Sequence, residues 1–347
     1  MLDKQRISLP DTTKGIAVLL MIQVHIMELF AKQEIYDSSR GSISLFFGGI
    51  PAAPIFLLLM GYFLAYSKKR PTEIALRGVR LFFGGLLLNI GLNLNLLYKI
   101  FYENWNLNPL HYVFGADILT LAGLSLLCFA IIQKITTNRY FIYFGLAIVI
   151  ALASHFIYPN QFEDHSLRYI FSFFVGGTSW SFFPLVPWLS FPLLGFGIKL
   201  LNDKLVITAL LNKSWSKYII ATLTLILVLT LNIAITITNN LAEYYHFDFL
   251  FFLWSISFII CWLYLLYYIE KKFRKTLVVH YLQFLGKNVT VVYVIQWLII
   301  GNLATTFYKS KEFDQWALWV LFITIAASSL TYLWVKLRTF IVKKYFH

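Results

Sequence analysis

Long apolar runs divide this sequence, and they limit its fold more than any other feature. About ten of them approach the twenty or so apolar residues that a helix needs to cross roughly 30 Å of hydrocarbon. Only 13% of the 347 residues are charged, whereas a water-soluble chain carries about a quarter. Alternating strand patterns are absent, and lipid tolerates only helices or closed barrels. The sequence therefore predicts an all-α, polytopic membrane protein.

The apolar runs predict a bundle of about ten transmembrane helices in one domain. No Gly/Ser-rich linker separates them, so residues 1–347 are expected to form a single integral-membrane domain. The first run lacks a small-residue cleavage site and is expected to stay in the membrane. The expected spans are 13–31, 46–67, 77–98, 111–133, 140–158, 181–201, 217–238, 249–269, 285–306 and 316–340.

The formal net charge is +13, and the distribution of this charge predicts the orientation of the chain. Lys and Arg gather in alternate loops, which the positive-inside rule places in the cytoplasm together with both termini. Because the excess follows the loops, it indicates a membrane orientation and argues against a nucleic-acid partner. Acidic residues such as Glu163 and Asp164 fall in the opposite loops. The cytoplasmic groups are then Lys68, Lys69, Arg70, Arg77 and Arg80; Lys271, Lys272, Arg274 and Lys275; and Lys343 and Lys344.

The first apolar run carries ionisable residues that are costly to place in a bilayer. His25 follows Lys14 by eleven residues, which on a helix brings it within about 20° of Lys14 and roughly 16 Å further along. Because an ionisable group at the bilayer centre costs at least ~2.5 kcal/mol, it is by default a candidate functional residue. Glu28 lies one turn further on and is either a solvated rim residue or a catalytic one.

Asp117 is expected inside the fourth run at a depth similar to that of His25. Its carboxylate would then orient the imidazole and stabilise the protonated form, as in a general base with an acidic partner. The alternative is that Asp117 bonds to a neighbouring helix and His25 is an ordinary core histidine. The amide of Gln296 is a further polar group within an apolar run.

The cytoplasmic cluster offers a possible anion site. Arg77 and Arg80 are one helical turn apart, and their planar guanidinium groups suit phosphate oxygens. The alternative is that the cluster only retains the chain in its orientation or binds lipid headgroups. Cys128 and Cys261 lie in apolar runs as small core residues, and no metal site is expected.

Irregular structure is expected near residue 180. The connection from Pro159 to Trp180 contains the apolar piece YIFSFFVGG, which is too short to cross a membrane and is expected to dip into the outer interface. The next span opens with FFPLVPWLSFP, whose three prolines predict a kinked or broken helix. Such backbone is tolerated in a membrane where it is buried in protein or lines a cavity.

Several segments, taken in order, resemble membrane acyltransferases related to the catalytic domain of heparan-α-glucosaminide N-acetyltransferase, within the wider acyltransferase-3 superfamily. The opening resembles theirs, with Lys14 at a position where arginine is more usual and a histidine at His25. The penultimate span has Gln296 where some relatives have a histidine. The similar segments are RISLPDTTKGIAVLLMIQVH, PAAPIFLLLMGYFLAYSKK, LRGVRLFFGGLLLNI, HYVFGADILTLAGLSLL, FFPLVPWLSFPLLGFG and LGKNVTVVYVIQW.

The resemblance implies an acetyl-CoA-dependent O- or N-acetyltransferase of a bacterial plasma membrane. It would move an acetyl or other short acyl group from cytoplasmic acyl-CoA to a hydroxyl or amine of an extracytoplasmic glycan or lipid-linked sugar. His25 and Asp117 would be the catalytic pair, while Lys14, Arg77 and Arg80 would bind the CoA phosphates. The alternatives are a polytopic transporter or exporter of a sugar or lipid precursor, which would show two paired internal halves, and a scaffold without catalysis.

Overall fold

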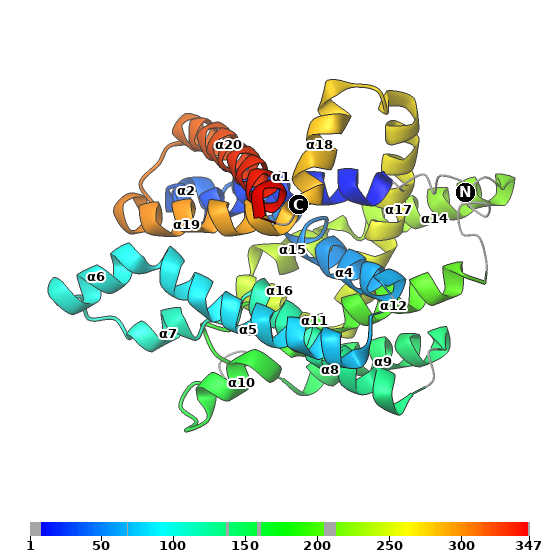
Figure 1. The fold of residues 1–347 in the computed structure, drawn as a ribbon, viewed down its shortest axis with the longest axis horizontal. Helices are drawn as coiled ribbons and strands as arrows, with labels where there is room; N and C mark the ends of the chain where they lie inside the picture. Colours follow the sequence, from blue (N-terminus) through cyan, green and yellow to red (C-terminus); the bar gives the residue numbers. More distant parts are fainter. Residues whose placement is uncertain (1–7, 68, 137–138, 158–160, 205–212, 346–347) are drawn as a thin grey trace.

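A computed structural model describes residues 8–67, 69–136, 139–157, 161–204 and 213–345, and these ranges are almost entirely helical (Figure 1). Within them, strand pairing is limited to two isolated bridges, Ala31 with Lys311 and Ala116 with Ser181. The all-α, polytopic prediction is confirmed. Lys68 of the expected cytoplasmic cluster and Pro159 of the expected outer connection lie outside the described ranges.

Every expected span has a helical counterpart, although not all are long enough to cross a bilayer as one straight helix. In the described chain eight spans are long and apolar enough. A ninth is a pair of helices bent by 56°, α14 (Ser214–Leu229) and α15 (Leu231–Asn239). The remaining expected span, 140–158, corresponds to a shorter helix, α9 (Tyr140–Ala153), which a 3₁₀ turn extends to Phe156. The eight long spans are α1 (Leu9–Leu29), α3 and α4 together (Ser39–Gly49 and Ala53–Ser67), α5 (Pro71–Leu92), α8 (Ile118–Ile135), α11 and α12 together (Leu185–Trp188 and Ser190–Asn202), α17 (Phe249–Phe273), α19 (Val289–Phe307) and α20 (Phe313–Tyr345).

Short helices connect these spans. They are α2 (Gln33–Tyr36), α6 (Leu94–Tyr102), α7 (Pro109–Val113), α10 (Arg168–Phe174), α16 (Leu241–Tyr245) and α18 (Leu277–Lys287).

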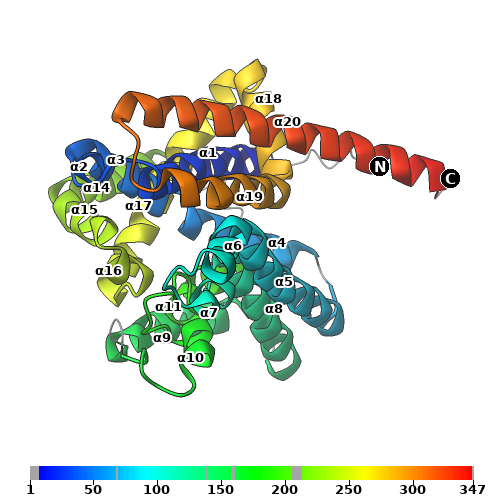
Figure 2. The same ribbon diagram turned by 90° about the vertical axis from the view of Figure 1, so that its left-hand side faces the viewer.

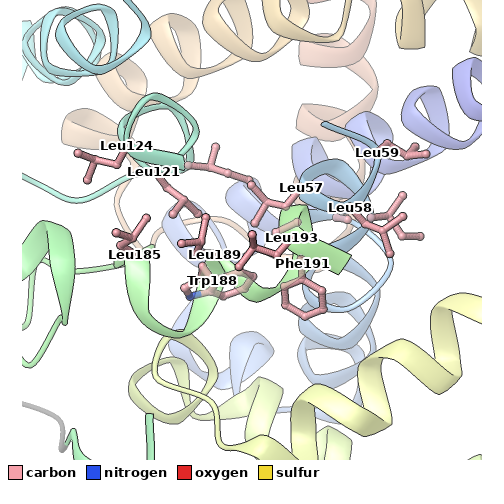
Figure 3. Close-up of a cluster of buried hydrophobic side chains, with 14 of the residues drawn as sticks. Leu57, Leu58, Leu59, Leu121, Leu124, Leu185, Trp188, Leu189, Phe191 and Leu193 are labelled. Atoms are coloured by element: carbon pink, nitrogen blue, oxygen red, sulfur yellow. The ribbon is translucent and has the colours of Figure 1, made fainter. Parts of the chain in front are cut away.

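The main core lies where α4, α8, α11 and α12 meet. Leucines of α4 and α8 surround Trp188 and Phe191, both of which are 0% exposed (Figure 3). The helices α4 and α12 cross so closely that a Cβ on Gly61 would lie 1.9 Å from the Pro192 carbonyl oxygen. Small residues permit such backbone approach in membranes, where packing drives helix association.

A second core joins the two ends of the chain. The helices α1, α19 and α20 run side by side along the upper side of Figure 2, and Val18, Ile26 and Ile300 are buried between them. On its other side α1 crosses α18 at glycines, since a Cβ on Gly15 would lie 2.0 Å from the Leu282 carbonyl oxygen and one on Gly286 would lie 1.8 Å from that of Asp11. This packing holds α1 against α18, α19 and α20.

The broken helix predicted from the prolines is confirmed. Residues 185–202 form two helices, and Val186 departs from helical geometry with φ −99° and ψ 122°. The preceding apolar piece forms the short helix α10, whose Phe173 packs edge-on against Phe82 of α5. The segment therefore covers the bundle without crossing it.

Candidate functional site

One cavity of about 490 Å³ is lined by His25, Glu28, Asp117 and Lys309 together with several aromatic residues. Its walls come from α1, α2, α3, the start of α8, the segment before α11, α15, α16 and α19, and from the loop that follows α19. These segments are far apart in the sequence, so the cavity forms only when the bundle folds. His25 and Asp117 both line this cavity.

His25 is held on α1 by polar and aromatic contacts. Two residues earlier, Gln23 Nε2 donates to the Ser44 carbonyl (2.9 Å) and Ser44 Oγ donates to Gln23 Oε1 (2.6 Å), which ties α1 to α3. The imidazole lies against the indole of Trp297, with ring centroids 4.2 Å apart and planes inclined by 34°. Its Nδ1 is buried and has no hydrogen-bond partner among the described residues.

Asp117 is at the start of α8 and not inside a span, which corrects the expected helix start near residue 111. Its Oδ1 accepts hydrogen bonds from the amides of Leu119 (3.0 Å) and Thr120 (2.9 Å), so it is the N-cap of α8. Aspartate favours this position because its side chain satisfies helical N–H groups that lack partners. Its Oδ2 is buried with no hydrogen bond to any described residue.

The extended segment before Asp117 is fixed by two other parts of the chain. Asn89 of α5 donates from Nδ2 to the carbonyls of Gly115 (2.8 Å) and Val113 (3.2 Å). The amide of Ala116 donates to the Trp180 carbonyl (3.1 Å), and the amide of Phe183 donates to that of Ala116 (2.7 Å). These bonds aim the carboxylate into the cavity.

No hydrogen bond joins His25 to Asp117 within the described chain, so the direct pairing expected from their depths is not present in this structure. Tyr293 and Trp297 of α19 line the cavity with them. The Tyr293 phenol interacts with the Asp117 carboxylate and with Trp297, and Trp297 contacts His25. Asp117 and His25 are therefore linked through two aromatic residues one helical turn apart.

The expected donor-binding residues lie elsewhere. Lys14 forms an ion pair with Asp11 (3.0 Å) and lies 5.0 Å from the centroid of the Phe63 ring. Arg77 and Arg80 are exposed on α5, one turn apart. None of the three is among the described residues that line the cavity, and no described contact joins Lys14 to the two arginines.

Residues 8–338 of the chain match the acyltransferase domain that defines the acyltransferase-3 family. The chain belongs to the acyltransferase-3 family. No curated protein and no solved structure is detectably similar to it. It is accordingly a multi-pass membrane acyltransferase, and this assignment does not favour the alternative of a transporter.

The acyltransferase has a charged pair in the cavity that sequence reasoning did not identify. Glu28, for which the sequence left open a solvated rim position or a catalytic role, lines the cavity one turn from His25. Lys309 follows α19 and lines the same cavity, with its ammonium group 3.7 Å from the centroid of the Tyr36 ring. The contact of Lys309 with Tyr36 depends on folding, so no local sequence signal reveals it.

Burial changes the titration of both groups in this contact. It raises the pKa of the Tyr36 phenol to about 12, and the charges of Glu28 and Asp37 add to this shift. Burial lowers the pKa of the Lys309 ammonium, while the same two carboxylates oppose this shift. The Tyr36 phenol therefore remains protonated at neutral pH and can donate a hydrogen bond toward the cavity.

Two aromatic residues of the acyltransferase site also escaped sequence reasoning. Tyr293 and Trp297 have a four-residue spacing in the segment VVYVIQW, and this spacing is the signal that places both on one helix face. Gln296, which was considered for its polarity, points elsewhere: it is 0% exposed, does not line the cavity, and its amide has no partner in the described chain. No three His, Cys, Asp or Glu side chains of the described residues come together as metal ligands.

Proposed function

We propose that this acyltransferase moves an acetyl or other short acyl group from cytoplasmic acyl-CoA to a hydroxyl or amine of an extracytoplasmic glycan or lipid-linked sugar. The observation that carries the proposal is the placement of His25 in the cavity together with Asp117, in a chain of the acyltransferase-3 family. The ordered segments quoted above further support a position near the heparan-α-glucosaminide N-acetyltransferases, in a bacterial plasma membrane.

In this proposal His25 is the general base. It removes the proton from the acceptor while the acceptor oxygen or nitrogen bonds to the acyl carbon. When the carbon–sulfur bond breaks, the imidazolium returns the proton to the departing CoA thiolate. A positioned base of this kind typically contributes about 10²- to 10⁴-fold to the rate. Asp117 would act on the imidazole through the aromatic pair and not by direct contact.

Lys14, Arg77 and Arg80 are proposed to bind the phosphates of the donor on the cytoplasmic side. The arginines are exposed and one turn apart, as a shared anion requires. His25 lies roughly 16 Å further along α1 than Lys14. The pantetheine arm of the donor would therefore have to extend into the bundle to deliver the thioester to the cavity.

The test is a comparison of cells that produce the wild-type protein with cells that produce His25→Ala. Mass spectrometry of their surface glycans should show acylated species only in the wild type, at equal protein levels in the membrane. His155→Ala is the matched control, because His155 is an exposed histidine at the end of α9, outside the cavity. Identical acylation in wild type and His25→Ala would overturn the proposed role of His25.

A further inference from the structure

The loop after α19 is built to bring one lysine to the cavity. Lys309 has φ 51°, a left-handed conformation that non-glycine residues rarely adopt. Such a conformation persists only where the surroundings enforce it, and it is frequent at ligand sites. Here the amide of Lys309 donates to the Leu29 carbonyl (3.0 Å) and the amide of Lys311 donates to that of Phe30 (2.8 Å). The end of α1 therefore holds the loop in place.

Glu28 and Lys309 carry opposite charges into one cavity without closing on each other. They form no ion pair in the described chain, and the ammonium instead lies over Tyr36. The Glu28 carboxylate acts electrostatically on Lys309 and on the hydroxyl groups of Tyr36 and Tyr244. A ligand can occupy the space between the two side chains by accepting a hydrogen bond from Lys309 and donating one to Glu28.

Tyr244 supplies a second, independent sign of a ligand. Its side chain is 5% exposed and lines the cavity, and its hydroxyl has no hydrogen-bond partner in the described part of the chain. A buried polar group normally has a partner, so one that faces a cavity indicates that a ligand or solvent supplies it. The indole of Trp297 also lines this cavity.

We propose that Glu28 and Lys309 determine acceptor specificity and select an uncharged, hydroxyl-rich ring such as a neutral pyranose. This inference rests on the proposed function, because it assigns the acceptor of the same reaction. Ring hydroxyls donate to the Glu28 carboxylate and accept from the Lys309 ammonium, and the tyrosine faces cover the apolar C–H surface of the ring. One hydroxyl is then presented to His25, one turn from Glu28.

The charges in the cavity disfavour an anionic acceptor. An anionic sugar would bring a further negative charge close to Glu28 and Asp117 in a partly dehydrated cavity. Interactions between charges are much stronger there than in water. Glu28 and Asp117 set two carboxyl groups against the Lys309 ammonium in this cavity, so a neutral polyol satisfies Glu28 and Lys309 without adding a further negative charge.

Two matched probes test this specificity. Methyl glucoside and methyl glucuronide share a ring and differ in whether the sixth carbon is a hydroxymethyl group or a carboxylate. With purified protein in nanodiscs and radiolabelled acetyl-CoA, wild type should show a kcat/KM for the glucoside at least about tenfold above that for the glucuronide, because a like charge in the site is strongly unfavourable. Glu28→Gln, which keeps a hydrogen-bonding group of the same shape, should reduce this ratio at least about threefold.

Lys309→Met should raise the KM for methyl glucoside more than it lowers kcat, because it removes a binding contact and leaves His25 in place. The controls are Glu34→Gln and Lys311→Met, two changes on the same side of the protein but outside the cavity lining, and they should leave the ratio and the KM unchanged. Thermal unfolding of each variant confirms that it is folded.

The outcomes separate this inference from the proposed function. If wild type neither transfers the label nor hydrolyses acetyl-CoA in a His25-dependent way, the proposed function fails. If it hydrolyses acetyl-CoA but acetylates neither glycoside, the neutral-ring assignment is overturned. Equal or preferred use of the glucuronide, or a ratio unchanged by Glu28→Gln, overturns it as well.

Discussion

The imidazole of His25 and the indole of Trp297 lie 4.2 Å apart between ring centroids, with their planes inclined by 34°. This contact ties the first helix to α19 inside the cavity and is the direct packing contact of the proposed base. It also places Trp297 between His25 and Tyr293, the residue whose phenol interacts with Asp117.

Replacing Trp297 should therefore lower turnover without preventing folding. Aromatic pairs contribute about 0.5–1.5 kcal/mol beyond their buried area, so Trp297→Leu should lower kcat by about 2- to 12-fold and Trp297→Phe by less. Acetyl transfer in nanodiscs measures this effect. Trp334→Leu, on the exposed side of α20, is the control and should not change kcat. A Trp297→Leu enzyme with wild-type kcat would contradict a positioning role for the indole.

Asp117 should have two separable effects. Asp117→Ala removes the cap of α8 and should cost about 0.5–2 kcal/mol of stability, whereas Asp117→Asn keeps an oxygen for the cap and should mainly lower turnover. Asp248→Ala is the control, because Asp248 caps α17 in the same way (2.8 Å to the Phe251 amide) outside the cavity lining. It should lower stability without a specific loss of kcat.

The losses from His25→Ala and Asp117→Asn should be non-additive if both residues serve one proton transfer. Removing the base makes its partner irrelevant, so the double variant should be as slow as His25→Ala alone. Strictly multiplicative losses in purified protein, or a fully active His25→Ala, would rule out a functional pair.

His246 should make the outer segment before α11 sensitive to acid. Its Nδ1 faces the Ala242 carbonyl (2.9 Å) and must carry the proton, so Nε2 accepts from the Gly177 amide (3.0 Å). Burial lowers the pKa of His246 below the ordinary 6.5, and the Ala242 bond only partly opposes this. Protonation breaks the Gly177 bond. This contribution to stability is therefore present above about pH 6.5 and is lost as the pH falls toward the lowered value.

Thermal unfolding in nanodiscs at neutral and mildly acidic pH measures this effect. The wild-type Tm should fall on acidification, and His246→Asn, which does not titrate, should show a smaller fall. The exposed His155 provides the control His155→Asn, which should behave as wild type. An equal acid response in His246→Asn would show that other groups cause it.

The orientation of the chain is testable by cysteine labelling after Cys128 and Cys261 are replaced by alanine. We expect Asp164→Cys to react with an impermeant maleimide in intact cells and Lys272→Cys to react only after permeabilisation. The reverse pattern would exchange the donor and acceptor sides.

Charge reversal of both Arg77 and Arg80 to Glu should weaken acetyl-CoA binding at least about tenfold, because a hydrogen bond to a charged group contributes about 1.5–3 kcal/mol. Equilibrium binding of radiolabelled acetyl-CoA in detergent measures the effect. Lys134→Glu, a charge reversal at an exposed residue of α8, is the control. Unchanged binding in the double variant would leave the arginines with a role in orientation only.

Much of the fold could be predicted from the sequence, because a membrane-spanning helix is recognised by the length of an apolar run of consecutive residues. The apolar runs predicted the helices, and the three prolines predicted the break at Val186. Asp117 was misplaced because a cap and a buried helical residue look alike within an apolar run. The hydrogen bonds that hold the extended segment before Asp117 involve Asn89 and Trp180, and neither residue is near Asp117 in the sequence.

The candidate site was readable only in part. His25 and Asp117 stood out because ionisable groups are rare in apolar runs, and the cavity does contain both. The position of Lys309 depends on bonds to the end of α1, and that of Trp297 depends on helix packing. Such contacts join distant parts of the chain, so no local pattern reveals them.

The glycine crossing of α1 and α18 has a consequence for how the acceptor enters. At Gly15 and Gly286 backbone meets backbone, and there is no room even for a methyl group. No side chain separates α1 from α18 there, so the two helices cannot slide past each other. We therefore expect His25 and Glu28 to move only when α1 and α18 move together. The wall formed by α3 shares this restraint, because a Cβ on Gly48 would lie 2.1 Å from the Cβ of Val24 on α1, whereas no described glycine of α15 or α16 makes such a crossing. We therefore expect the acceptor to enter the cavity on the side of α15 and α16, past walls that can move without displacing α1.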